Sequence, residues 1–269
     1  MTLDVHRVTP TSPESWRSLS DRLVAMLKPF ALPLAISFLK DTESIDASRR
    51  DDLYPEPNEY GRTGQVPAGC VFWIHGSRER FVTTASDHAN CSVGSFTHGF
   101  LTLDEAMTKD DVGAVLESGW VDESSVASLP RITTKPGSIV YGPLATSECA
   151  PDVVLLRVNG LGLMMLKDAL PELRVEGKPQ CHIVAIAAEQ KVVAASVGCA
   201  LSRARTGMKA DEMTCAIPGS RLTEVVDALE ATVALNRGMA TYASVDAKRF
   251  CTDQDNRRWH ANRTGHFSD

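Results

Sequence analysis

The alternation of apolar and polar positions near the start of the chain predicts a helix followed by a strand. Residues 12–28 place four apolar side chains at helical spacing, behind a Ser–Pro pair typical of an N-cap and first turn, and Pro29 stops the pattern. These side chains are Trp16, Leu19, Leu23 and Met26. The next segment, "LPLAISFLK" (32–40), is short, rich in β-branched and aromatic residues, and bounded by turn-forming residues, so it predicts a strand.

The middle of the chain mixes short helical patterns with polar loops. Residues 41–66 are charged and contain prolines and glycines, which predicts a long loop. Residues 67–82 indicate a short helix around Cys70 that ends at Gly76, with a strand near 80–85. Residues 103–119 have Asp104 near a helix start, a rough apolar stripe and Gly119 as a stop, and "DESSVASLPRI" adds a second short helix.

The second half of the chain alternates strand and helix patterns. "GSIVYGPL" (137–144) and "PDVVLLRV" (151–158) predict strands, and "NGLGLMMLKDAL" predicts a helix entered through a glycine turn. The glycines of "VNGLG" lack the spacing of a Rossmann or P-loop motif, so a tight strand-to-helix turn is the better interpretation. "CHIVAIAAEQKV" (181–192) is compatible with a helix or a buried strand.

The remaining elements complete an α/β pattern. "DEMTCAIPGS" predicts a strand ending at Pro218, and residues 220–238 predict the clearest helix, with Ser220 as cap and Gly238 as stop. We expect a layered mixed sheet with flanking helices in a single domain over 1–250. A small helical subdomain within 100–135 is compatible with it, and the polar segment 251–269 is expected to be a tail or partner arm.

Charge and hydropathy narrow the functional classes. The chain has 34 acidic against 28 basic residues, a net charge of −6, and the basic residues are scattered, so nucleic acid is not expected as a partner. No secretory signal pattern opens the chain and no apolar run is long enough to cross a bilayer. We therefore expect a soluble cytoplasmic protein that does not bind membranes and acts on a small molecule. Whether it forms a homo-oligomer stays open.

The most distinctive chemical feature of the chain is its seven cysteines. An odd number in a reducing compartment argues against a disulfide framework. No two of them form a CxxC pair, so any site must be assembled from distant segments. For each cysteine alone, a small buried hydrophobe is the simpler interpretation.

Four of the cysteines stand in segments that resemble a known family. The segments, in order, are "PLAISFLKD", Cys70 before an aromatic run, Cys91 to Gly94, "SIVYGPL", "DVVLLRVNGLGLMML", Cys181, "SVGCALSRAR" with Gly198 to Arg203, and "CAIPGSRL". Over residues 20–230 this pattern resembles the uncharacterised DUF169 (ArCR) family. The resemblance implies a set of four cysteines and an iron–sulphur cluster, but no settled reaction. The chain departs from it with "CSVG", where a proline more often follows the cysteine, and with the long 41–66 segment.

The first site hypothesis is that Cys70, Cys91, Cys181 and Cys199 hold a [4Fe-4S] cluster. Thiolate also suits zinc, and ligand count alone does not choose between the two. Arg203 or Arg205 would line the pocket, raise the potential of the cluster and hold an anionic substrate. If only three thiolates bind, the open iron could act as a Lewis acid. Cys149 and Cys251 lie outside the resemblance and are not expected to be ligands.

A second hypothesis makes His88 or Cys91 an axial ligand of haem, since imidazole and thiolate are common donors to haem iron. His88 is equally a candidate general acid or base, with His98 and His75 as competitors. The structural alternative for Asp87 and His88 is an Asx-type turn with a solvated imidazole.

A third hypothesis is a metal-free sensor or ligand-binding module with Cys91 and Cys199 as redox-responsive thiols near Arg203 and Arg205. Metal content separates it from the other two. Neither a G-x-S-x-G elbow nor an H-E-x-x-H helix is present, which argues against the hydrolases that carry these motifs.

Overall fold

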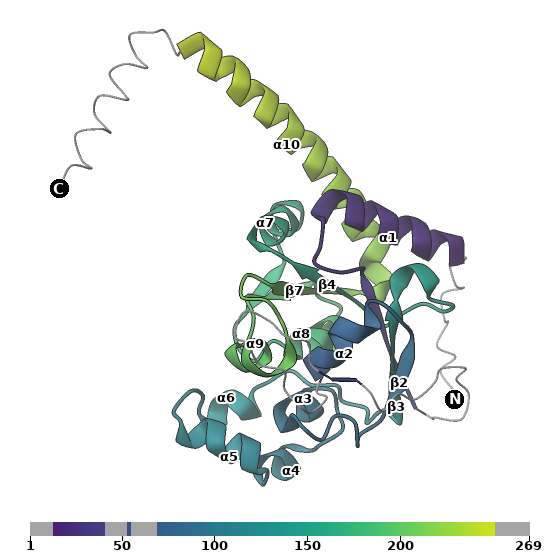
Figure 1. The fold of residues 1–269 in the computed structure, drawn as a ribbon, viewed down its shortest axis with the longest axis vertical. Coiled ribbons are helices and arrows are strands. Elements are labelled where there is room, and N and C mark those ends of the chain that lie inside the picture. The colour runs from purple at the N-terminus through teal and green to yellow at the C-terminus, as the bar shows by residue number, and fades with distance from the viewer. Residues whose placement is uncertain (1–12, 41–52, 55–68, 251–269) are drawn as a thin grey trace, which may run out of the picture.

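The computed structural model describes residues 13–40, 53–54 and 69–250. Within these ranges the chain forms a seven-stranded mixed sheet with helices on both faces (Figure 1), which confirms the expected α/β class. The strand order is β2-β3-β1-β4-β7-β6-β5, and each neighbouring pair is antiparallel except β5 and β6. Most of the 41–66 segment and the 251–269 tail, including Cys251, lie outside the described residues.

The strands are short and mostly buried. In chain order they are β1 Leu34–Leu39, β2 Phe81–Thr83, β3 Ser138–Pro143, β4 Val153–Val158, β5 Arg174–Glu176, β6 Ala194–Ser196 and β7 Met213–Pro218. Every residue of β3 and β4 is buried, which is the pattern of strands covered on both faces. The expected strands at 32–40, 80–85, 137–144 and 151–158 and the one ending at Pro218 are thereby confirmed.

One face of the sheet packs against three long helices, α1 Pro13–Leu27, α7 Gly160–Ala169 and α10 Leu222–Phe250 (Figure 1). Their apolar stripes meet strand residues of the same face, among them Val154, Leu156 and Ile217. Successive strand residues point to opposite faces of a sheet. Cys215 therefore lies on the face covered by α1, α7 and α10, and its neighbour Ala216 lies on the opposite face.

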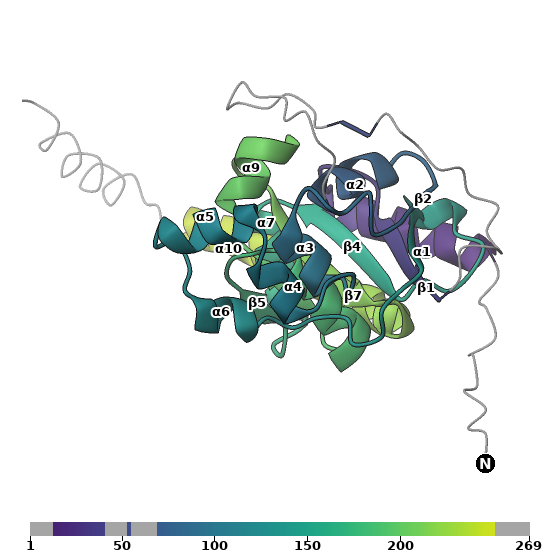
Figure 2. The same ribbon diagram turned by 90° about the horizontal axis from the view of Figure 1, so that it is seen from below.

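The opposite face is covered by shorter helices, which Figure 2 shows in front of the sheet. They are α2 Gly69–Gly76, α3 Ser92–Thr97, α4 Leu103–Met107, α5 Asp110–Glu117, α6 Glu123–Ala127, α8 His182–Ala185 and α9 Ala200–Thr206, together with the short helical segment η2 Ile186–Gln190. Two further short helical segments, η1 Leu144–Thr146 and η3 Gly219–Arg221, lie beside α1 and α10. The segment 181–192, open from the sequence, is therefore helical over most of its length.

Two helix expectations were wrong in their extent. The segment 103–119 forms two helices, because Thr102 and Glu105 build a capping box for α4 and the acidic pair Asp110–Asp111 begins α5 after a break. The helix expected to end at Gly238 continues to Phe250. A glycine ends a helix by adopting a left-handed conformation, and Gly238 keeps a negative φ.

A buried ion pair ties β4 to the loop before β7. The guanidinium of Arg157 donates to both carboxylate oxygens of Glu212 at 2.5 and 2.8 Å, and Glu212 is fully buried. None of the helices in the described part of the chain is long and apolar enough to cross a membrane.

Candidate functional site: a cysteine-lined cavity

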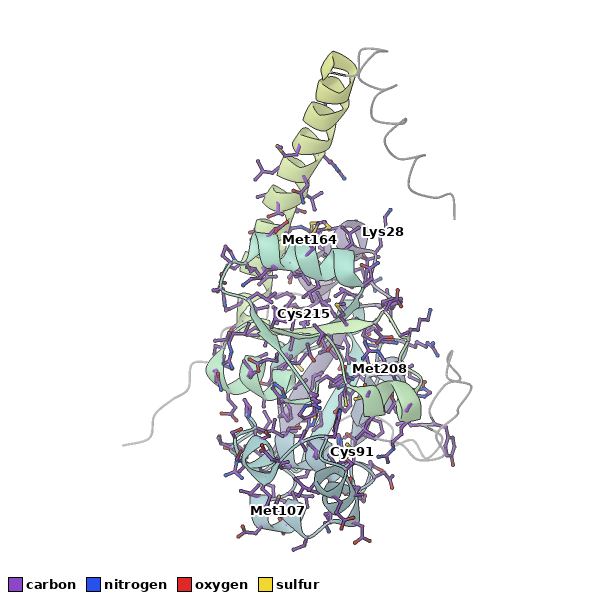
Figure 3. The ribbon with its side chains drawn as sticks, turned by 90° about the vertical axis from the view of Figure 1, so that its left-hand side faces the viewer. Lys28, Cys91, Met107, Met164, Met208 and Cys215 are labelled. Carbon is purple, nitrogen blue, oxygen red and sulfur yellow. The ribbon has the colours of Figure 1, made fainter. Side chains whose placement is uncertain are left out.

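A cavity of about 260 Å³ lies among the short helices on the side of the sheet away from α1, α7 and α10. Its lining comes from α2, α3, α5, α6, α9 and the loop that leads into α8. Figure 3 shows Cys91 and Met208 in this layer of the molecule, with Cys215 at the level of the sheet. The cavity is thus built from segments that are far apart in the sequence.

The structure brings the four expected cysteines together on this cavity, since Cys70, Cys91, Cys181 and Cys199 all line it. Cys70 is the second residue of α2, and each of the other three directly precedes a helix, α3, α8 or α9. Cys181 and Cys199 are 6% and 7% exposed. The four thiols, each at the start of a different short helix, therefore line one cavity.

The surroundings of the thiols favour their neutral form. Burial raises the pKa of Cys70 well above its ordinary value, and the nearby Cys181 raises it further. Burial likewise raises the pKa of Cys181, with Cys91 as the second cause. Burial also raises the pKa of Cys91, but a backbone hydrogen bond at Gly94 and the charge of Arg205 act in the opposite direction. Cys91 has the surroundings most favourable to a thiolate among these three.

The four thiols do not form a ready site for one metal ion. Among the residues that the structure describes, no group of three or more Cys, His, Asp or Glu side chains has the arrangement that a single ion would need. Tetrahedral zinc draws its sulphur ligands to about 2.3 Å from one centre. In a [4Fe-4S] cluster each thiolate binds a different iron, so its four sulphur atoms stand further apart. Four thiols match the number of ligands that a [4Fe-4S] cluster takes.

Gln180, which sequence reasoning missed, lies among the thiols. Its Nε2 is 3.2 Å from Cys70 Sγ, 2.9 Å from Ser202 Oγ and 2.8 Å from Met208 Sδ. Its buried Oε1 has no hydrogen-bond partner among the described residues. Its position next to Cys181 was the only available signal, and adjacency alone does not reveal the contact with Cys70.

The two candidate arginines have different positions. Arg205 lines the cavity and donates a hydrogen bond to the carbonyl of Asn90 at 3.0 Å, beside Cys91. Arg203 is not among the described residues that line the cavity. Its guanidinium donates to the carbonyls of Ala210, Val197 and Glu212 at 3.0, 3.1 and 2.7 Å.

Arg203 also explains the glycine of the Gly198–Cys199 turn. Gly198 has a φ of +109°, and a Cβ atom there would stand 2.1 Å from the Arg203 guanidinium. Glycine is therefore required twice, for the backbone conformation and for the close approach of Arg203. The turn and its arginine together place Cys199 at the start of α9.

His88 lies in the aromatic core behind the cavity, and it is not among the described cavity-lining residues. It is 1% exposed, and its ring centroid is 4.8 Å from that of Phe72 and 4.9 Å from that of Phe100. Its Nε2 is 3.0 Å from Thr83 Oγ1, and burial lowers its pKa well below the ordinary value. The alternative of a solvated imidazole was wrong, because the ring is enclosed by aromatic side chains.

The competing histidines also lie away from the cavity lining. His98 is buried, its Nδ1 bonds the Gly94 carbonyl at 2.7 Å, and burial lowers its pKa to about 4. His75 Nε2 bonds the carbonyl of Tyr54 at 2.8 Å. Cys149 is exposed, and Cys215 is buried on the other face of the sheet, so neither lines the cavity.

Helix α5 and two loops contribute cavity residues that the sequence did not single out. Asp111 and Val115 of α5 line the cavity, as do Trp120 in the loop after α5 and Lys178 in the loop before α8, whose Nζ lies 4.3 Å from the centre of the Trp120 ring. Asp111 accepts a hydrogen bond from the Ser92 backbone at 2.9 Å. A helical pattern predicts which residues face the inside of the protein, but it does not predict that they line a cavity.

The fold and the cavity define an α/β protein with a mixed sheet and a cysteine-lined pocket under a layer of short helices. The sequence profile of the DUF169 family, described as uncharacterised ArCR, matches residues 22–228. The chain belongs to this family, as the sequence resemblance indicated. Comparison with curated proteins found no match, and comparison with solved structures found none.

Proposed function

We propose that the protein carries a [4Fe-4S] cluster on Cys70, Cys91, Cys181 and Cys199 and acts on a small anionic molecule as an oxidoreductase or lyase. The observation that carries this proposal is the convergence of four thiols, from four separate segments, on one cavity. Cysteines that served only as small core residues need not line the same cavity. When bound, the cluster supplies electron transfer or a Lewis-acidic iron.

The residues around the thiols suit an anionic thiolate cluster. The Gln180 amide is placed to donate to Cys70 Sγ, and the Gly94 backbone and Arg205 favour the thiolate of Cys91. Donors and cations near the sulphur atoms stabilise the more negative, reduced state and raise the potential of a cluster. The apolar walls would keep water away from it.

Within this proposal Arg205 is the residue that holds the anionic substrate, because its guanidinium lies on the cavity beside Cys91. Arg203 is a positioning residue, because its donors bind backbone carbonyls around the Gly198–Cys199 turn. His88 is a core residue without a place on the cavity, which weakens both the haem alternative that depends on it and its role as acid or base.

A metal-free thiol sensor is the second candidate, because Cys91 and Cys199 line the same cavity near Arg205. Arg205 lowers the pKa of this thiol relative to burial alone, and Cys199 lies near enough to affect it. Reactive thiols need a lowered pKa, and here burial and Asp111 act against Arg205 by raising the pKa of Cys91. This alternative requires no metal, so metal content distinguishes it from the cluster.

Anaerobic reconstitution of cysteine variants with iron and sulphide tests the proposal. Cys91→Ala is expected to lose most of its bound iron, whereas Cys215→Ala, on the other face of the sheet, should bind as much as the unaltered protein. Circular dichroism of both variants checks that they fold. Equal iron in both variants would contradict the assignment of Cys91.

A further inference from the structure

The cavity is lined by two kinds of residue. The four thiols form its thiol side, and the remainder includes an apolar wall from α5, α6, the loops that follow these two helices, and one residue of α9. The wall consists of Ala114, Val115, Trp120, Val121, Val126, Leu129 and Leu201. The apolar wall supplies no ligand to a cluster, and it offers a surface on which a second occupant with a hydrocarbon body would pack.

Two cations border the same space. Neither Arg205 nor Lys178 forms an ion pair with a carboxylate in the described part of the chain. Lys178 rests on Trp120, and Arg205 gives one donor to Asn90, out of the five that a guanidinium offers. The carboxylate on the wall, Asp111, is bonded to the Ser92 backbone. A cation without an ion-pair partner beside an apolar wall is the arrangement that binds a ligand with both an anionic group and an apolar body.

We infer that the ligand is a short-chain monocarboxylate whose carboxyl group binds Arg205 and whose hydrocarbon body packs on Val115, Trp120 and Leu129. The inference deepens the proposed function, and it rests on that function for the thiol side of the cavity. A planar guanidinium matches a carboxylate in a two-point hydrogen bond. An inorganic phosphate, with more charge to dehydrate and no apolar body, fits the wall poorly.

The size of the space limits the ligand to a small molecule. A volume of about 260 Å³ is slightly below the range of small-molecule pockets, which span roughly 300–1,000 Å³. A cluster at the thiol side would occupy part of it. Chains of a few carbon atoms therefore fit, and long-chain fatty acids do not.

Isothermal titration calorimetry with acetate, butyrate, hexanoate and inorganic phosphate tests the inference on protein purified without oxygen. Affinity is expected to rise about fourfold per added methylene until the wall is covered, with phosphate binding more weakly than butyrate. Arg205→Met should weaken butyrate binding at least tenfold, and the matched control Lys40→Met, an exposed lysine outside the cavity lining, should leave it unchanged.

Iron analysis of the same samples separates this inference from the proposed function. Iron-loaded protein with the same affinity for acetate, butyrate and hexanoate would overturn the inference and leave the cluster in place. Iron-free protein with the expected chain-length dependence would support the inference while the cluster fails. Phosphate binding tighter than butyrate would overturn the inference in either case. The chain-length series needs no variant, so it decides even where Arg205→Met does not fold.

Discussion

The Gly198 turn gives a quantitative prediction for the part of the structure that places Cys199. In the variant Gly198→Ala the new Cβ atom would overlap the Arg203 guanidinium, 2.1 Å away, at a backbone φ of +109°. The dihedral strain costs about 1–2 kcal/mol for a residue with a side chain. The guanidinium must also leave its three carbonyl acceptors.

Those three hydrogen bonds set the second part of the magnitude. Hydrogen bonds to charged groups contribute about 1.5–3 kcal/mol each when buried, but two of these are solvent-exposed, so we expect about 2 kcal/mol for the set. Gly198→Ala should therefore lose about 3–4 kcal/mol of unfolding free energy, and Arg203→Ala about 2 kcal/mol. The double variant should lose hardly more than Gly198→Ala alone, because the first substitution already displaces Arg203.

Urea unfolding followed by circular dichroism measures these differences, with a chelator present so that bound metal does not alter the apparent stability. Gly113→Ala is the matched control. A Cβ atom there meets nothing within 4 Å inside helix α5, so the variant should be unchanged or up to about 1 kcal/mol more stable. Additive losses in the double variant would refute the contact between Gly198 and Arg203.

Three further predictions concern pH and the buried charges. Burial lowers the pKa of His98 from 6.5 to about 4, so the unfolded chain takes up a proton that the folded chain does not. The contribution of His98 to the free energy of unfolding should be fully present above about pH 6.5 and should fall by roughly 3 kcal/mol toward pH 4, at about 1.4 kcal/mol per pKa unit. In urea titrations His98→Gln should reduce this pH dependence. Because burial raises the pKa of Cys70 and Cys91, and binding must remove their protons, iron uptake in reconstitution assays should increase from pH 7 to pH 8.5; a flat profile would contradict this. Glu212→Ala leaves Arg157 buried without its partner and should cost about 3–5 kcal/mol, visible as a large fall in Tm.

The sequence predicted the fold class because its elements carry clear local signals. Apolar spacing marked residues 12–28 as a helix, and β-branched runs marked the strands around 34–39 and 153–158. The length of α10 was missed because glycine at position 238 costs a helix only about 1 kcal/mol, which its neighbours can offset. Such small energies leave helix ends undetermined by local pattern.

The candidate site was predictable in part. The family resemblance selected the four cysteines that line the cavity, whereas their spacing alone did not. The choice between Arg203 and Arg205 depends on which side of a single helical turn faces the cavity, and the burial of His88 depends on aromatic residues from other segments. Both depend on tertiary contacts between distant segments, which the pattern within one segment does not predict.

The most direct test of the proposed function is the ultraviolet–visible spectrum of protein purified without oxygen, with iron, sulphide and zinc measured in the same sample. A broad brown absorbance with about four iron and four sulphide per chain is the result that the cysteine-lined cavity predicts. A sharp Soret band would instead identify haem. A colourless protein that binds neither iron nor zinc after reconstitution would contradict the cluster and favour a thiol-based sensor.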